Sequence, residues 1–144
     1  MKNFMGRNVT SVGAHGLALV SRAPFYPSKG LRTFLPAWKK KDLFRDWQNK
    51  DLDKKSLKGA ILCFDECVGV HEGYERLLSL IEKGEGPSAI LVSGSLPYQF
   101  AALLATEASM RKIAIISDLG PAFMDAVREG DRIEVKSDGT VVII

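Results

Sequence analysis

The sequence predicts an α/β fold with a mixed sheet and about three helices. From Lys58 onward, short apolar runs alternate with segments of helical periodicity, which is typical of strands layered against helices. The last residues, DRIEVKSDGTVVII, place an Asp-Gly pair between two arms rich in β-formers, as in a β-hairpin. A chain of 144 residues is long enough for one domain with its own core, so we assign residues 1–144 to a single domain.

Four apolar stretches have the length of strands rather than of helices. They are GLALVS at 16–21, GAILCF at 59–64, SAILVSG at 88–94 and KIAIIS at 112–117. The second arm of the hairpin, VVII at 141–144, is entirely apolar, so we expect it to lie centrally in the sheet or to be tightly docked.

The segments between these strands carry helical signals. In HEGYERLLSLIEKGEG, apolar residues fall on one face at three- and four-residue spacing: Tyr74, Leu77, Leu78 and Ile81. Gly84 suits the end of this helix. PYQFAALLATEAS and PAFMDAVREG open with Pro97 and Pro121, which the first turn of a helix tolerates. A short helix is also expected in LFRDWQNKDLD, at 43–53.

Composition indicates a soluble protein, with 46% hydrophobic and 26% charged residues. No apolar run approaches the roughly 20 residues that span a bilayer, and the start, MKNFMGRNV, lacks the apolar stretch of a secretory signal. We therefore expect a cytoplasmic protein without a membrane partner. Cys63 and Cys67 are too few for a disulfide scaffold or a four-ligand zinc site. We expect reduced thiols, with Cys63 buried in a strand; the alternative is a reactive Cys67 or a single ligand to a shared site.

A long basic insert occupies about residues 24–56. Residues 22–58 hold eleven Lys and Arg against four Asp, a net charge of +7, although the whole chain carries only +3. Aromatic residues are interleaved with these cations, as in single-strand nucleic-acid binding. A solvated loop anchored by its aromatic residues, an acidic partner subunit or an anionic substrate would explain the same charge. We do not expect nucleic acid to be the partner.

Five stretches, taken in order, cover nearly the whole chain: GRNVTSVGAHGLALVSRAPF, SLKGAILCF, GPSAILVSG, PYQFAALLATE and REGDRIEVKSDGTVVI. In order and spacing the chain resembles the swivel domain of the aconitase X family. The resemblance implies a swivelling β/β/α domain, the small subunit of a heterodimeric hydro-lyase (dehydratase), that closes over a larger catalytic subunit. It also implies reversible dehydration of a small hydroxy acid, such as a phosphorylated mevalonate or a hydroxyproline.

Such a dehydration needs a placed base and a Lewis acid on the leaving oxygen. The resemblance implies iron or an iron–sulfur cluster in the partner subunit, so we assign no cofactor and no metal ligand to this chain. Closure of the two parts would assemble the site and exclude water. We therefore do not expect this chain to be active alone.

The loop after GAILCF departs from that family. The resemblance implies a Gly- and Ser-rich loop whose serine acts as the base. Here the loop is DECVGVHEGY, and no serine occurs between Phe64 and Ser79. Gly69 and Gly73 fall where the family has glycines, and we predict that they contact the substrate.

His71 and Glu72, at the start of a helix beside this loop, could take over the acid/base work. A helix N-terminus would also favour a bound anion through its free N–H groups and its dipole. The alternative is that Glu72 is a first-turn acid stabilised by that dipole and His71 a cap or surface residue. Substituted chemistry or a non-catalytic paralogue is also open.

Other residues are predicted to contact the substrate. Glu66, next to Asp65, would add a paired carboxylate at the strand exit. Asp46 is assigned from the resemblance, which implies an aspartate near this distance before the SLKG stretch. A second polar turn ends the SAILVSG strand, where α/β proteins often bind ligands, unless it is an ordinary connection. It comprises Ser93, Gly94 and Ser95.

Two other classes compete with the subunit hypothesis. The phosphohistidine domain of phosphoenolpyruvate-using enzymes shares the general architecture, but Phe100 stands where its histidine would fall, and phenylalanine cannot accept a phosphoryl group. A non-catalytic interaction module would use the insert at 24–56 as its binding surface.

Overall fold

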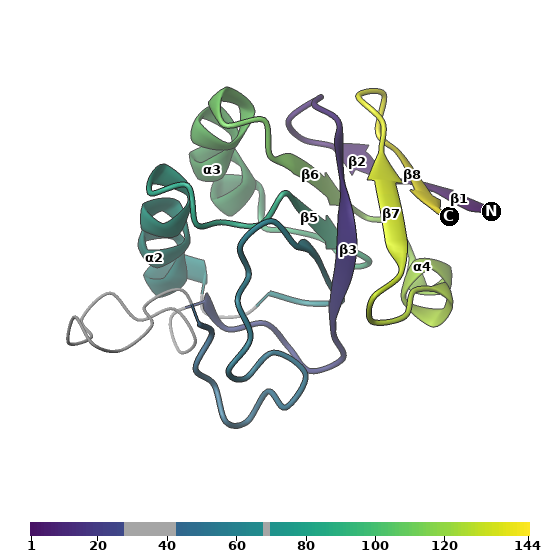
Figure 1. Ribbon diagram of the computed structural model, residues 1–144. Helices are drawn as coiled ribbons and strands as arrows, with labels where there is room; N and C mark the ends of the chain where they lie inside the picture. Colours follow the sequence, from purple (N-terminus) through teal and green to yellow (C-terminus); the bar gives the residue numbers. More distant parts are fainter. Residues whose placement is uncertain (28–42, 68–69) are drawn as a thin grey trace.

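The computed structural model describes residues 1–27, 43–67 and 70–144, of which 70–74, 98–100 and 103 are described by their backbone. Within these parts eight strands form one sheet, ordered β1-β8-β7-β3-β4-β5-β6-β2 (Figure 1). The strands are β1 (Lys2–Met5), β2 (Arg7–Asn8), β3 (Ala14–Ser21), β4 (Ile61–Phe64), β5 (Ala89–Val92), β6 (Ala114–Ser117), β7 (Arg132–Val135) and β8 (Thr140–Ile143). The predicted α/β fold with a mixed sheet is confirmed.

β3 joins the parallel and the antiparallel half of the sheet. Its residues 14–17 pair antiparallel with β7, and its residues 18–21 pair parallel with β4. The strands β4, β5 and β6 continue the parallel half, while β7, β8 and β1 continue the antiparallel half. β8 lies between β1 and β7, so the apolar VVII arm is internal, as predicted.

The sheet is almost closed on itself by the N-terminal residues. β1 pairs with β8 at one end of the strand order and β2 pairs with β6 at the other, and only Gly6 separates β1 from β2. A Cβ atom at Gly6 would lie 2.2 Å from the backbone oxygen of Ser117. The closure therefore depends on a backbone approach that only glycine allows.

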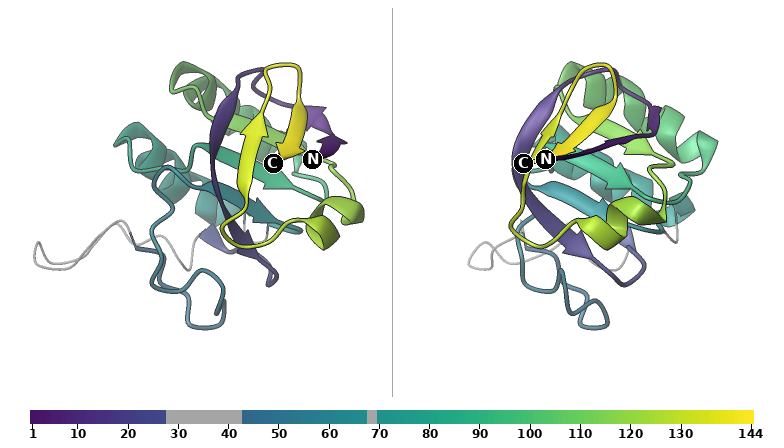
Figure 2. Two further views of the ribbon diagram at one scale, coloured as in Figure 1. Left: turned by 45° about the vertical axis from the view of Figure 1, so that its right-hand side comes forward. Right: turned by 90° about the vertical axis from the view of Figure 1, so that its right-hand side faces the viewer.

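Three helices are described: α2 (Val70–Glu82), α3 (Tyr98–Met110) and α4 (Pro121–Ala126). α2 and α3 lie side by side against one face of the sheet, and α4 lies on the other side of the molecule (Figures 1 and 2). Alternate residues of the parallel strands belong to two hydrophobic cores, one on each face of the sheet. Leu62, Ile90 and Ile115 belong to the core under α2 and α3, and their neighbours Ile61, Leu91 and Ile116 to the core with α4. Burial on both faces explains why these strands are continuous apolar runs.

The predicted helix at 43–53 is wrong, because the described part of the insert forms turns there. Side chains compete for the backbone N–H groups that a helix would use. Asp46 Oδ1 accepts from Gln48 N at 3.1 Å, and Asn49 Oδ1 accepts from Leu52 N at 3.3 Å.

Apolar packing fixes this part of the insert to the sheet. The ring of Phe25 stacks between those of Phe44 and Phe64, with centroids 5.5 and 4.9 Å away. Phe25 N donates to Glu66 O at 2.9 Å, which ties the insert to the end of β4. Phe44, Leu52 and Leu57 are fully buried. Residues 43–57 thus form a folded extension of the domain.

Candidate functional site

Polar turns follow three neighbouring parallel strands at the same edge of the sheet, where ligands of α/β proteins commonly bind. Asp65 follows β4, Ser93–Ser95 follow β5 and Asp118 follows β6. Backbone hydrogen bonds join the turns, because Gly94 N donates to Asp65 O at 3.1 Å and Asp118 N donates to Gly94 O at 2.8 Å. A Cβ atom at Gly94 would lie 2.6 Å from Asp65 O, so glycine is required where the turns meet. We call these residues the carboxyl edge.

Serine hydroxyls fix both carboxylates of the carboxyl edge. Ser93 Oγ donates to Asp65 Oδ1. Ser95 Oγ donates to Asp118 Oδ1 at 2.7 Å, and Ser117 Oγ donates to Asp118 Oδ2 at 2.9 Å. Because their protons are engaged within the protein, these serines orient the carboxylates and offer a ligand only acceptor lone pairs.

Asp118 is an exposed carboxylate that stays ionised. The hydrogen bonds from Ser95 and Ser117 lower its pKa, and the positive charge of Arg7 adds to the effect. Its backbone φ of 57° lies in the left-handed region, which aspartate tolerates better than most residues. A carboxylate of lowered pKa is a weak base and a persistent hydrogen-bond acceptor.

Replacing Ser95 with alanine should raise the pKa of the Asp118 carboxyl, because it removes the largest cause of the lowering. The folded pKa is depressed, so this carboxylate stabilises the fold fully above the ordinary aspartate value of about 3.9 and loses that effect as pH falls through the folded value. Carboxyl NMR titration measures the shift. As the pH is lowered, the melting temperature of Asp118→Asn should fall less steeply than that of the wild type. An unchanged Asp118 pKa in Ser95→Ala would contradict the assignment.

Comparison with known proteins decides the family. The family model described as the aconitase X swivel domain matches residues 3–143. The chain belongs to the aconitase X swivel domain family. The resemblance predicted from the sequence is therefore confirmed over nearly the whole chain. A search of curated proteins gave no significant match.

Two solved structures share the swivel-domain fold. One is a chain of holo-form aconitase X from Thermococcus kodakaraensis, which is 23% identical with a TM-score of 0.79, covering 100% of this chain and 99% of that one. The other is the solution NMR structure of a UPF0107 protein, which is 27% identical with a TM-score of 0.79, covering 99% of both chains. No helix in the described parts of this swivel domain is long and apolar enough to cross a membrane.

The structure brings some of the predicted site residues together at the carboxyl edge. Ser93, Gly94 and Ser95 form one of its turns, and Ser93 is only 5% exposed. The backbone of His71, Glu72 and Gly73 lies at the start of α2. Gly69 lies outside the described residues. The catalytic roles of His71 and Glu72 remain predictions.

The other two predicted site residues are Asp46, which lies in the insert, and Glu66, which contacts the insert through its backbone. Asp46 is only 5% exposed and holds the turn at Gln48 by its side chain. Glu66 has an exposed side chain, and its backbone oxygen accepts from Phe25 N. The contacts seen for Asp46 are those of a residue that shapes the insert, and its contact with a substrate remains a prediction.

Sequence reasoning missed Asp118, Ser117 and Arg7. The signal was available, because Asp118 directly follows the KIAIIS strand just as Asp65 follows ILCF. Arg7 had no comparable signal, since its place beside β6 arises from the pairing of β2 with residues more than a hundred positions away.

Cys63 is buried in β4 of the swivel domain, as predicted, and Cys67 is buried as well. Burial raises the pKa of Cys63, and burial together with Glu66 raises the pKa of Cys67 to about 12. Such thiols hold their protons at neutral pH and are weak nucleophiles. Among the described residues, no three His, Cys, Asp or Glu side chains form a group that could hold a metal ion.

Proposed function

We propose that this chain is the small, swivelling subunit of an aconitase X-like hydro-lyase, and that its carboxyl edge closes over the active site of a larger metal-bearing subunit. The full-length match to one chain of the Thermococcus aconitase X crystal structure carries this proposal, because that chain has nearly the same extent as this one. The family match over residues 3–143 supports it. The substrate would be a small hydroxy acid, such as a phosphorylated mevalonate or a hydroxyproline.

The carboxyl edge has groups suited to such a substrate. Asp65 and Asp118 are fixed acceptors for substrate hydroxyl groups, since serines hold both carboxylates in place. The first turn of α2 would attract the anionic end of the acid through its N–H groups. His71 and Glu72 are the candidates for moving the proton, and the partner's iron or iron–sulfur centre would activate the leaving hydroxyl.

Affinity purification of the tagged chain from its native host tests the subunit role. We expect a larger protein to be recovered in equal amount, and the metal to be found in the complex rather than in this chain alone. Turnover should require both chains. Full activity of the isolated chain, or recovery of the chain without a larger partner, would contradict the proposal.

In the reconstituted complex, His71→Ala and Glu72→Ala should each reduce kcat by about 100-fold or more, which is the usual contribution of a general acid or base. Glu75→Ala is the matched control, because Glu75 is an exposed acid one turn along the same helix. Steady-state kinetics with the identified substrate measures the effect. If both variants keep full activity, the acid/base role lies elsewhere.

A non-catalytic interaction module is the second candidate. It is favoured by one observation, the absence of serine between Phe64 and Ser79 in a loop where the family resemblance implies a catalytic serine. In that case the partner would still be recovered, but variants at His71, Glu72 and Asp118 would leave the activity of the complex unchanged.

A further inference from the structure

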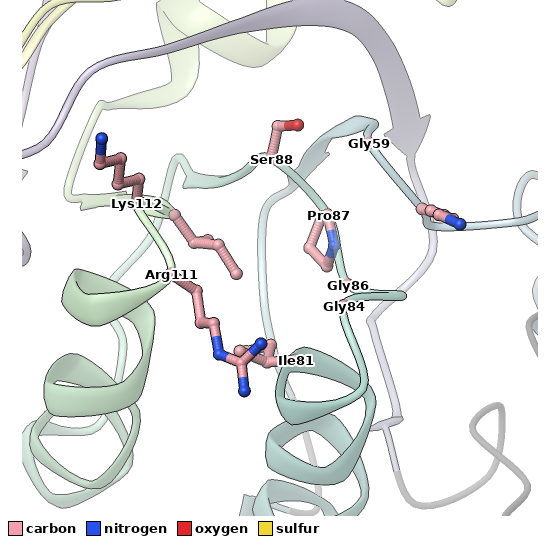
Figure 3. Close-up of a pocket in the computed structure, with 10 residues that line it drawn as sticks. Gly59, Ile81, Gly84, Gly86, Pro87, Ser88, Arg111 and Lys112 are labelled. Carbon is pink, nitrogen blue, oxygen red and sulfur yellow. The ribbon is translucent and has the colours of Figure 1, made fainter.

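A hollow of about 290 Å³ lies at the edge opposite the carboxyl edge, between the C-terminal ends of α2 and α3 and the starts of β5 and β6 (Figure 3). It is lined by Lys58, Gly59, Ile81, Gly84, Gly86, Pro87, Ser88, Arg111, Lys112 and Ile113. Figure 3 shows Arg111 reaching from the end of α3 toward Ile81 of α2, with Pro87 on the segment leading into β5. The hollow is therefore remote in the fold from the proposed substrate edge.

The lining combines apolar and cationic groups. Ile81, Pro87 and Ile113 are buried and supply the apolar part, with at most 7% of each isoleucine exposed. Lys58, Arg111 and Lys112 supply three cations, and no acidic residue is among the described residues of the lining. Glu107 partly neutralises Arg111, at 3.4 Å between Oε1 and Nε. The two lysines thus provide most of the charge available to a ligand.

Lys112 stands where a glycine would be expected. Both helices end in the same hydrogen-bond motif: Glu85 N donates to Leu80 O at 3.0 Å after α2, and Ile113 N donates to Ala108 O at 2.7 Å after α3. In each case the residue before the donor has a positive φ. That residue is Gly84 (φ 73°) after α2 but Lys112 (φ 58°) after α3. A side chain in this conformation is strained, and the lysine so held lines the hollow.

A second hollow shares part of the lining of the first. Lys58 and Gly59 also line a depression of about 600 Å³ that runs along β3 past His15 and Leu17. Leu17 is 57% exposed, which makes it one of the exposed large apolar residues of the described chain. Glu129, at the far side, is engaged by Lys55 at 3.1 Å. Because Lys58 and Gly59 line both hollows, the two adjoin, and we call them together the trough. Two adjoining hollows offer more room than a single small ion fills.

We propose that this trough binds an extended acidic segment of a partner protein. Its carboxylates would face Lys58 and Lys112, and an apolar side chain of the segment would rest on the exposed Leu17. A free phosphate would use the cations but leave the apolar lining and Leu17 without a role. The segment would attach the partner at the edge away from the carboxyl edge, so the site is independent of the proposed catalytic role.

The test uses the full chain and a fluorescently labelled peptide in which glutamates alternate with leucines. Binding is measured by fluorescence anisotropy at two salt concentrations. We expect saturable binding that weakens with salt, becoming about threefold weaker in Lys58→Met or Lys112→Gly and about tenfold weaker in the double variant. Lys136→Met, which removes an exposed cation of the C-terminal hairpin, should bind as the wild type does.

Lys112→Gly separates binding from folding. Glycine relieves the left-handed strain, so this variant should melt a few degrees above the wild type while it binds the peptide more weakly. Absence of peptide binding, or equal binding by the double variant, would overturn the proposal. Equally tight binding of inorganic phosphate would show that the trough is only an anion site. Tighter binding of a single-stranded oligonucleotide would show that its ligand is nucleic acid. Either result also overturns the proposal.

Discussion

Gly6→Ala should destabilise the protein by about 3 kcal/mol or more, at or above the upper end for overpacking. The added Cβ would lie 2.2 Å from the backbone oxygen of Ser117 and 3.1 Å from the backbone nitrogen of Leu119. Both are backbone atoms of the segment that ends β6, so they cannot move aside as the tip of a side chain would. Thermal unfolding followed by circular dichroism should show a melting temperature lower by roughly 10 °C.

Gly84→Ala is the matched control. Gly84 has a φ of 73°, but no atom lies within 4 Å of the position that its Cβ would occupy. Its replacement carries backbone strain of about 1 kcal/mol without any overlap. If Gly6→Ala costs no more than Gly84→Ala, the close approach between Gly6 and Ser117 is not what holds the sheet closed.

Phe25→Ala should cost about 3–5 kcal/mol, the usual range for removing a buried phenylalanine ring. Phe25 is 0% exposed, and its ring joins Phe44 of the insert to Phe64 of β4. Without it, residues 43–57 lose their main apolar attachment to the sheet. We therefore expect faster proteolytic cleavage within 43–57 under native conditions, in addition to a lower melting temperature.

Trp47→Ala provides the comparison within the same insert. Trp47 is 78% exposed, so its removal should change the free energy of unfolding by no more than about 0.5 kcal/mol. Limited proteolysis followed by mass spectrometry locates the cuts in both variants. Similar stability losses in Phe25→Ala and Trp47→Ala would show that the ring stack is not the attachment.

The parallel half of the fold could be predicted from the sequence because its strands are buried on both faces. ILCF and AILV are apolar throughout and AIIS is apolar up to Ser117, and each lies within a run predicted as a strand. β1 and β2 were harder, since KNFM and RN carry little apolar pattern and become strands only by pairing with β8 and β6. Strands that pair with residues so far away in the sequence leave no local sequence pattern by which they could be recognised.

The candidate site could likewise be predicted only where it follows a strand that is visible in the sequence. The turn at Ser93–Ser95 was found because a strand visibly ends there, whereas its hydrogen bonds to Asp65 and Asp118 depend on the order of strands in the sheet. The helix expected at 43–53 failed because its aspartate and asparagine side chains bind backbone N–H groups, which periodicity does not register.

The pairing of Lys2 with Ile143 also constrains when the protein can finish folding. During synthesis at about 5–20 residues per second, β1 has no partner until β8 has left the ribosome. The ring of Phe4, which packs against Phe123 at a centroid distance of 5.4 Å, likewise has no partner until a late part of the chain has been synthesised. The parallel strands β3 to β6 can assemble earlier, so the nascent chain would pass through an open sheet whose last step is the docking of its own first residues.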